Sequence, residues 1–231
     1  MKYVFFFFII SLILSCNIGT IAPSEQDLGK NYYPLEVGKF VIYDVKKIKY
    51  NELTVHDTSI YQLKEVVADT FRNTASELIY RIERFKRGTL IDQWQLDSVW
   101  TSRLENNARY VRTENNVPFI RLVLPADNNI SWNANALNVL KEDIHNIRNF
   151  GKRFQLGNDL FKETITVIQN QDSSLVDKDV RLEIYADTLG LIYKKSEIFQ
   201  YISDASDGRF GQDFIVRGDF LEQTYFQAGK E

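Results

Sequence analysis

The chain has 231 residues, of which 44% are hydrophobic and 26% charged, and its 28 basic and 31 acidic side chains give a formal net charge of −3. This length is enough for a sizeable core in a single domain. The mildly acidic balance argues against nucleic acid as a partner, because binding to phosphate backbones requires a basic patch. The single Cys excludes a disulfide within the chain.

The amino terminus has the layout of a secretory signal. Lys2 precedes an apolar run over residues 4–14, which is followed by Ser15 and Cys16. The run is shorter than the roughly 20 residues that a membrane-spanning helix needs. We therefore expect residues 1–15 to be a cleaved signal peptide rather than a transmembrane anchor.

The end of this signal, Ile-Leu-Ser followed by Cys16, resembles the lipobox of bacterial lipoproteins. The resemblance implies that Cys16 carries a diacylglyceryl group and that membrane lipid is one partner of the protein. It also implies a place in the cell envelope, and Asn17, which is not the Asp that acts as an inner-membrane retention signal in some bacteria, favours the outer membrane. The alternative is a plain secretory peptide in which a Cys stands at this position by chance.

The segment after the Cys is poor in large apolar residues and rich in Ser, Gly, Pro and Thr. We interpret residues 16–31 as a lipidated flexible tether and residues 32–231 as a single mainly β domain.

Strand-like alternation of side chains continues through most of this domain. Strands are predicted at residues 41–45 and 60–68, and the ranges 78–83 and 180–184 alternate apolar with charged residues, which indicates one face in water. The stretch from Ala186 to Gly190 has the composition of a hairpin loop, followed by a returning strand over 191–202. A closing strand is predicted over 214–226, where Gly218 indicates a bulge or a bend.

One segment, residues 134–150, fits two structures. Ala136, Val139, Leu140, Ile144 and Ile147 fall at helical spacing, but the surrounding Asn residues disfavour a helix. Both a short helix and a strand with a loop stay open from the residues alone.

Three short segments carry a family resemblance. Residues 33–45 contain Tyr-Pro-Leu-Glu-Val-Gly before an aromatic strand, residues 124–136 contain Leu-Pro and Ser-Trp-Asn-Ala-Asn-Ala, and residues 183–194 contain Glu-Ile-Tyr-Ala and Leu-Gly-Leu-Ile-Tyr-Lys. They resemble a group of uncharacterised Bacteroidota-type lipoproteins, although Phe40 stands where a Trp is usual and Ala134 where a Gly is usual. The opening pattern is also similar to lipoprotein-carrier half-barrels. The resemblance implies a curved antiparallel sheet or half-barrel with a concave apolar face, and a strand over 143–150. It implies no site residues.

Few residues suggest chemistry. His56 and His145 stand far apart, so no metal site is predicted, and no nucleophile motif or cofactor motif is present. Residues 204–208 are similar to a calcium loop, but Ile215 offers no oxygen at the twelfth position, which leaves a looser calcium site or a plain turn. The motifs around Ser98 and Thr188 resemble the O-glycosylation motif of exported proteins in this bacterial group.

Aromatic and acidic residues offer two further hypotheses. The three tryptophans are Trp94, Trp100 and Trp132. They either form a surface that stacks on sugars or lines a lipid site, or they pack in the core. A glycan hydrolase needs two carboxylates in one cleft, and the candidates, which we otherwise expect on solvated strand faces, are Glu65, Asp69, Glu83, Asp92 and Asp97.

The sequence thus favours a non-enzymatic, membrane-anchored binding or assembly module, whose partner is an unknown protein or a small hydrophobic ligand. The alternative is a carrier that holds a hydrophobic or lipid ligand in the cavity of a curved sheet. A glycan hydrolase is the least supported function, because it rests only on export and on the abundance of carboxylates.

Overall fold

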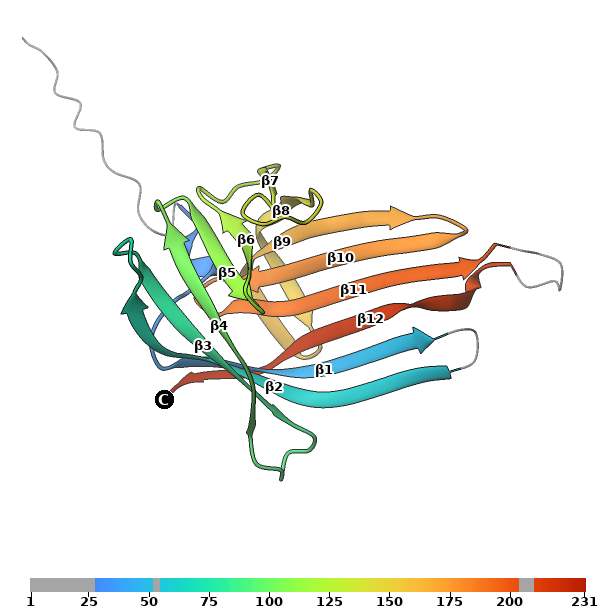
Figure 1. Ribbon diagram of the computed structural model, residues 1–231, viewed down its shortest axis with the longest axis horizontal. Coiled ribbons are helices and arrows are strands. Elements are labelled where there is room, and N and C mark those ends of the chain that lie inside the picture. The colour runs from blue at the N-terminus through green and yellow to red at the C-terminus, as the bar shows by residue number, and fades with distance from the viewer. Residues whose placement is uncertain (1–27, 52–54, 204–209) are drawn as a thin grey trace, which may run out of the picture.

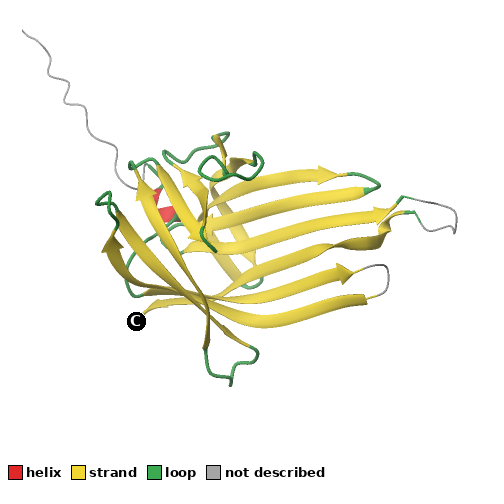
Figure 2. Ribbon diagram, in the orientation of Figure 1, coloured by secondary structure: helices red, strands yellow, loops and turns green. Residues whose placement is uncertain are grey.

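The computed structural model describes residues 28–51, 55–203 and 210–231 (Figure 1). The expected signal peptide over 1–15, Cys16, most of the tether and the loop 204–208 lie outside these ranges. Figure 2 shows that strands dominate the described chain. The strands are β1 (Lys39–Asn51), β2 (Val55–Arg72), β3 (Leu78–Arg87), β4 (Gln95–Glu105), β5 (Arg109–Glu114), β6 (Val117–Val123), β7 (Ser131–Asn133), β8 (Ile144–Leu156), β9 (Asp159–Ser173), β10 (Asp177–Ala186), β11 (Gly190–Ile202) and β12 (Gly211–Lys230).

All twelve strands belong to one sheet with the order β6-β5-β4-β3-β2-β1-β12-β11-β10-β9-β8-β7. The central pair β1 and β12 is antiparallel, as are the neighbours on both sides. One arm runs outward from β1 to β6, and the other returns from β7 at the far edge to β12. The expected mainly β fold with a curved antiparallel sheet is therefore confirmed.

The two edges of the sheet come together because β6 and β7 are consecutive in the chain (Figure 1). The backbone N–H of Ile120 on β6 donates to the carbonyl of Ala134, 2.9 Å away. The indole Nε1–H of Trp132 donates to the carbonyl of Ile120 at 2.9 Å, in a buried position. We call this contact the seam. It makes the curved sheet a nearly closed barrel, in which one face of each strand points to an interior.

The ambiguous segment forms a strand with a loop. β7 ends at Asn133, residues 134–143 make turns and irregular structure, and β8 begins at Ile144. The helical alternative is wrong because local hydrogen bonds from Asn side chains replace helical ones: the Oδ1 atom of Asn133 accepts the backbone N–H of both Asn135 and Asp143.

The hairpin predicted at Ala186 to Gly190 is present between β10 and β11. Thr188 has φ 61° and Gly190 has φ 90°, so the loop uses the left-handed region as expected. The bulge predicted at Gly218 lies next to it, because the pairing of β12 with β11 shifts register between Arg217 and Ile215. The pairing of β12 with β1 ends at Gly218, and a Cβ atom there would lie 2.1 Å from the carbonyl oxygen of Ile198. Close approach of two strands therefore requires this glycine.

The segment that precedes β1 closes one end of the interior. A 3₁₀ turn, η1 (Lys30–Tyr32), follows Leu28, whose carbonyl accepts the N–H of Ala126 at 3.0 Å. Packing thus begins at Leu28, inside the range assigned to the tether. Tyr32 and Tyr33 are both buried in the main core cluster, which also contains Leu122 and Ile147. This cluster fills the end of the barrel near the seam.

A second apolar cluster lies on the outer face of the carboxyl-terminal arm. It contains Phe161, Ile184, Ala186 and Ile192, and Phe154 of β8 packs against it. Successive residues of β10 point to opposite faces of the sheet. Ile184 lies on the outer face, so its neighbour Glu183 points to the barrel interior. In the part of the chain that the structure describes, no helix is long and apolar enough to cross a membrane.

Candidate functional site

The interior of the barrel contains a cavity of about 340 Å³. Its apolar wall comes mainly from β1 and β2, where Val41, Tyr43, Leu63 and Val67 face inward. Alternation along a strand explains this wall, since residues two apart share a face. A volume of this order is typical of sites for small molecules, which usually combine an apolar lining with a few polar groups.

Tyr33 forms the floor of the cavity. Its ring stacks on that of Tyr110 with 4.7 Å between centroids, and the ring of Tyr185 lies 6.0 Å away. The hydroxyl of Ser102 donates to the Tyr33 hydroxyl oxygen at 3.4 Å. Burial raises the pKa of Tyr33, so this phenol stays neutral at physiological pH. The floor is therefore an uncharged aromatic surface.

A continuous series of ion pairs crosses the cavity above this floor. Its members lie on β2, β3, β5, β6, β10 and β11, so it joins both arms of the sheet. We call it the charged belt, and it consists of Glu65, Arg84, Arg112, Glu114, Arg121, Glu183 and Lys194.

In the amino-terminal arm, Glu65 is the centre of the charged belt. Its Oε1 atom lies 2.9 Å from Nε of Arg84 and 2.7 Å from Nη2 of Arg112, and only 13% of its side chain is exposed. Burial alone would raise the pKa of Glu65, but the positive charges of Arg112 and Arg84 outweigh it and lower the pKa. Glu65 is therefore a charged cavity residue and not the solvated strand residue that we expected.

Across the seam, Glu183 is the centre of the second half. Its carboxylate lies 2.8 Å from Nζ of Lys194 and 3.7 Å from Nη1 of Arg121, and it accepts a hydrogen bond of 2.5 Å from the hydroxyl of Tyr185. Burial opposes ionisation of Glu183, yet Lys194 and Arg121 hold its pKa well below the usual range. Glu114 pairs with Arg121 and so connects this half to Arg112.

Trp100 on β4 lies against the two arginines of the first half. The guanidinium carbon of Arg84 is 3.6 Å and that of Arg112 is 4.6 Å from the ring centroid. Its Nε1–H is buried and has no acceptor among the described residues, and Nε of Arg112 also lacks a hydrogen bond there, whereas Nη2 of Arg112 pairs with the carboxylate of Glu65 at 2.7 Å. Two donors at one place in the cavity wall, Nε1 of Trp100 and Nε of Arg112, therefore have no hydrogen-bond acceptor among the described residues.

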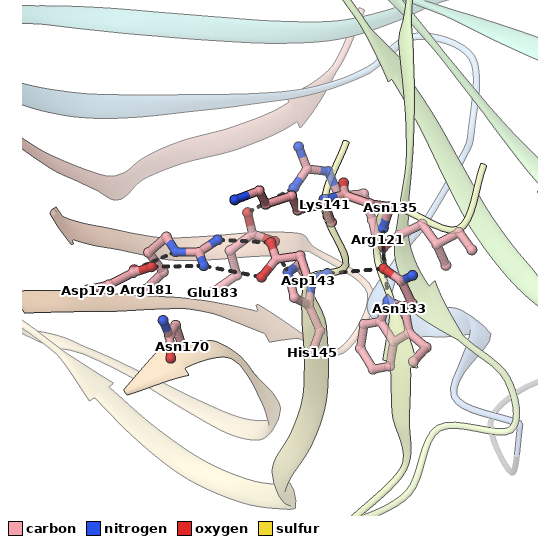
Figure 3. Close-up of polar contacts among 12 residues, drawn as sticks. Arg121, Asn133, Asn135, Lys141, Asp143, His145, Asn170, Asp179, Arg181 and Glu183 are labelled. Atoms are coloured by element: carbon pink, nitrogen blue, oxygen red, sulfur yellow. Dashed lines mark hydrogen bonds and ion pairs between the residues drawn. The ribbon is translucent and has the colours of Figure 1, made fainter. Parts of the chain in front are cut away.

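A separate polar cluster holds the loop 134–143 against β10 (Figure 3). Arg181 lies between Asp179 of its own strand and Asp143, with distances of 2.9 and 3.1 Å to the two oxygens of Asp143. The same carboxylate lies 3.1 Å from Nε2 of His145. Burial alone would raise the pKa of Asp143, but its bonds to His145 and Arg181 outweigh that effect and lower it. The cluster fixes the loop that follows β7 and so supports the seam.

The two histidines do not come together. His145 is almost fully buried beside Trp132, whereas His56 is exposed and lies against Tyr50. Among the described residues, no group of three or more His, Cys, Asp or Glu side chains is placed to hold a metal ion.

The three tryptophans have three different positions. Trp100 lines the cavity, Trp132 belongs to the seam, and Trp94 lies under Arg87 at 4.3 Å outside the cavity lining. Only Trp100 therefore matches the expectation of a ligand-lining aromatic residue.

The five acidic candidates also lie at different positions in the fold. Asp69 and Glu83 pair with Arg81 outside the cavity lining, Asp97 pairs with Lys86, and Asp92 accepts a backbone hydrogen bond in the loop between β3 and β4. Of the five, only Glu65 lines the cavity. All three cavity carboxylates, Glu65, Glu114 and Glu183, have lowered pKa values. A glycosidase acid requires a raised pKa, so the cavity does not favour glycan hydrolysis.

The modification candidates differ in access. Thr188 is exposed in the turn between β10 and β11, while Ser98 is half-buried and its hydroxyl donates to Asp97 at 3.0 Å. Thr188 therefore remains the better candidate for O-glycosylation.

Sequence reasoning missed most of the charged belt. The alternation at 180–184 predicts that Arg181 and Glu183 share one face, but the prediction that this face lies in water is wrong, because Glu183 is buried inside the barrel. The available signal was the row Tyr110, Arg112, Glu114 on a short strand, where opposite charges share the face of a buried aromatic residue. No family model, curated protein or solved structure matches this chain.

Proposed function

We propose that the protein is a non-enzymatic binding module whose barrel interior holds one small ligand with an apolar body. The observation that carries this proposal is the cavity of about 340 Å³, with its apolar wall on β1 and β2 and its aromatic floor. Apolar surface that faces an open cavity loses water when a ligand covers it, and this contributes about 25 cal/mol per Å². Transport of the ligand between membranes is one use of such a module, and retention at one membrane is another.

Binding of the neutral fluorescent dye Nile red tests the proposal. We expect a saturable rise in fluorescence, and alkyl compounds should displace the dye. The variant Leu221→Trp places a larger side chain in the cavity lining and should weaken binding. The matched control is Phe226→Trp on the same strand, where the side chain is 43% exposed and outside the lining. Absence of saturable binding, or equal binding by both variants, contradicts the proposal.

We infer in addition that the module is anchored in the cell envelope through lipid on Cys16. The signal-like residues 1–15 and the lipobox resemblance support this inference. Membrane fractionation of the full chain and of Cys16→Ser is the test. Wild-type protein in the membrane fraction and soluble Cys16→Ser with altered processing are expected. If the variant stays in the membrane and its signal is cut as before, lipidation is wrong.

A further inference from the structure

The cavity has the opposite charge to the protein as a whole. Among the described residues, nine charged side chains line it, of which six are Lys or Arg and three are Glu, so their net charge is +3. The whole chain has a formal net charge of −3. The positive groups are therefore concentrated in the interior, where water screens charge less than at the surface. Such an interior attracts anions and disfavours cations.

The unmet donors mark the place where an anion would bind. The Nε1 atom of Trp100 and the Nε atom of Arg112 are buried and have no hydrogen-bond acceptor among the described residues, whereas Nη2 of Arg112 pairs with Glu65 at 2.7 Å. Buried donors of this kind are rare in native proteins, and a ligand or an ion is one way to satisfy them. Arginine next to an aromatic ring is well suited to planar or tetrahedral anions.

An apolar surface begins directly beside these donors. Leu63 and Val67 stand two residues before and after Glu65 on β2 and share its face, and both line the cavity. A ligand whose charged end contacts Arg112 would therefore place its next atoms against apolar side chains.

We propose that the cavity selects an anionic amphiphile, whose carboxylate or phosphate accepts hydrogen bonds from Arg112 and Trp100 while its hydrocarbon chain lies along β1 and β2. This proposal rests on the proposed binding function and adds the charge of the ligand. A fatty acid and a phosphate monoester offer the same chemistry at this position, and the experiment separates them.

Four compounds with the same alkyl chain test the charge preference by displacement of Nile red: decanoate, decyl phosphate, decanol and decylamine. Hydrogen bonds to charged groups lead us to expect that at least one of the two anions binds about tenfold or more tightly than decanol. Decylamine should bind most weakly. The stronger of decanoate and decyl phosphate then identifies the head group.

Two variants connect the preference to the residues. Arg112→Gln removes the charge, and Trp100→Phe removes only the indole N–H and keeps an aromatic ring. Each should bring the anion and decanol close to equal affinity. The control is Arg103→Gln, because Arg103 also has a buried Nε without a hydrogen bond but pairs with Glu105 outside the cavity lining. If Arg112→Gln fails to fold, as circular dichroism would show, Trp100→Phe decides.

The outcomes separate this proposal from the proposed function. If Nile red and decanol bind but the anions gain nothing over decanol, the anion site is wrong and the binding function stands. The same conclusion follows if both variants keep the wild-type preference. If no compound binds at all, both proposals fail.

Discussion

Glu183→Gln is the sharpest test of whether the charged belt holds the two arms of the sheet together. The carboxylate is 3% exposed and contacts Lys194, Arg121 and Tyr185. Glutamine keeps the shape and still accepts from the Tyr185 hydroxyl, so the change removes mainly the charge. Breaking a buried ion pair costs about 3–5 kcal/mol. Because 25% of the Lys194 side chain remains exposed to water, we expect about 3 kcal/mol, at the lower end.

The assay is thermal and denaturant unfolding at neutral pH. For a domain of this size, 1 kcal/mol corresponds to roughly 2–4 °C in Tm, so the expected loss is roughly 6–12 °C. The control is Asp69→Asn, which removes the same charge from an ion pair of 2.9 Å whose carboxylate is 53% exposed. The control should change Tm very little, because water screens exposed pairs. Equal Tm values for both variants would refute a structural role of the charged belt.

The remaining predictions concern pH, one glycine and the loop after β7. The pKa values of the three cavity carboxylates are lowered from 4.5 in the folded protein, so below about pH 4.5 the unfolded chain binds more protons than the folded one. The free energy of unfolding should therefore fall as the pH falls below about 4.5. A denaturation midpoint that stays constant down to about pH 3 would contradict this linkage. Gly218→Ala should cost roughly 2–4 kcal/mol in the free energy of unfolding, because its Cβ would collide with the neighbouring backbone at φ 150°. The control Gly157→Ala, with open space at φ 56°, should cost only about 1–2 kcal/mol, and a similar cost for both would exclude the collision. Asp143→Asn should increase amide hydrogen exchange over residues 134–143, because it weakens the bond to Arg181. The control Asp179→Asn leaves that bond intact and should not increase exchange. Unchanged exchange in both variants would show that this cluster does not fix the loop.

Local patterns predicted β1, β2, β3, β10, β11 and β12, because alternation depends only on neighbouring residues, but they gave no range for β4, β5, β6, β7 or β9. The hairpin at Ala186 to Gly190 followed from turn composition, and the position of Gly218 in a strand was correctly marked as special. The role of Gly218 was not predictable, because it depends on Ile198 of another strand. In the same way, the Asn-rich segment after β7 became a loop through hydrogen bonds that Asn133 makes to residues two and ten positions later.

The cavity was not predictable from alternation, for a physical reason. A period of two assigns residues to faces but does not say which face is inside. Glu183 and Ile184 lie on opposite faces of β10, and both are buried, one in the charged belt and one in the outer cluster. Only the meeting of β6 and β7 at the seam makes the charged face an interior, and that contact joins the two edges of a twelve-stranded sheet.

Within the charged belt, Glu183 has opposite effects on the stability of the fold and on the binding of an anion. Glu183 stabilises the fold by pairing with Arg121 and Lys194, yet it also reduces the positive charge of the cavity. If an anionic amphiphile is the ligand, Glu183→Gln should lower Tm and at the same time increase the affinity for decanoate or decyl phosphate relative to decanol. A purely structural belt predicts lower stability with no gain in anion affinity. Measurement of both quantities on this single variant therefore separates the stabilising role of the belt from its role in ligand selection.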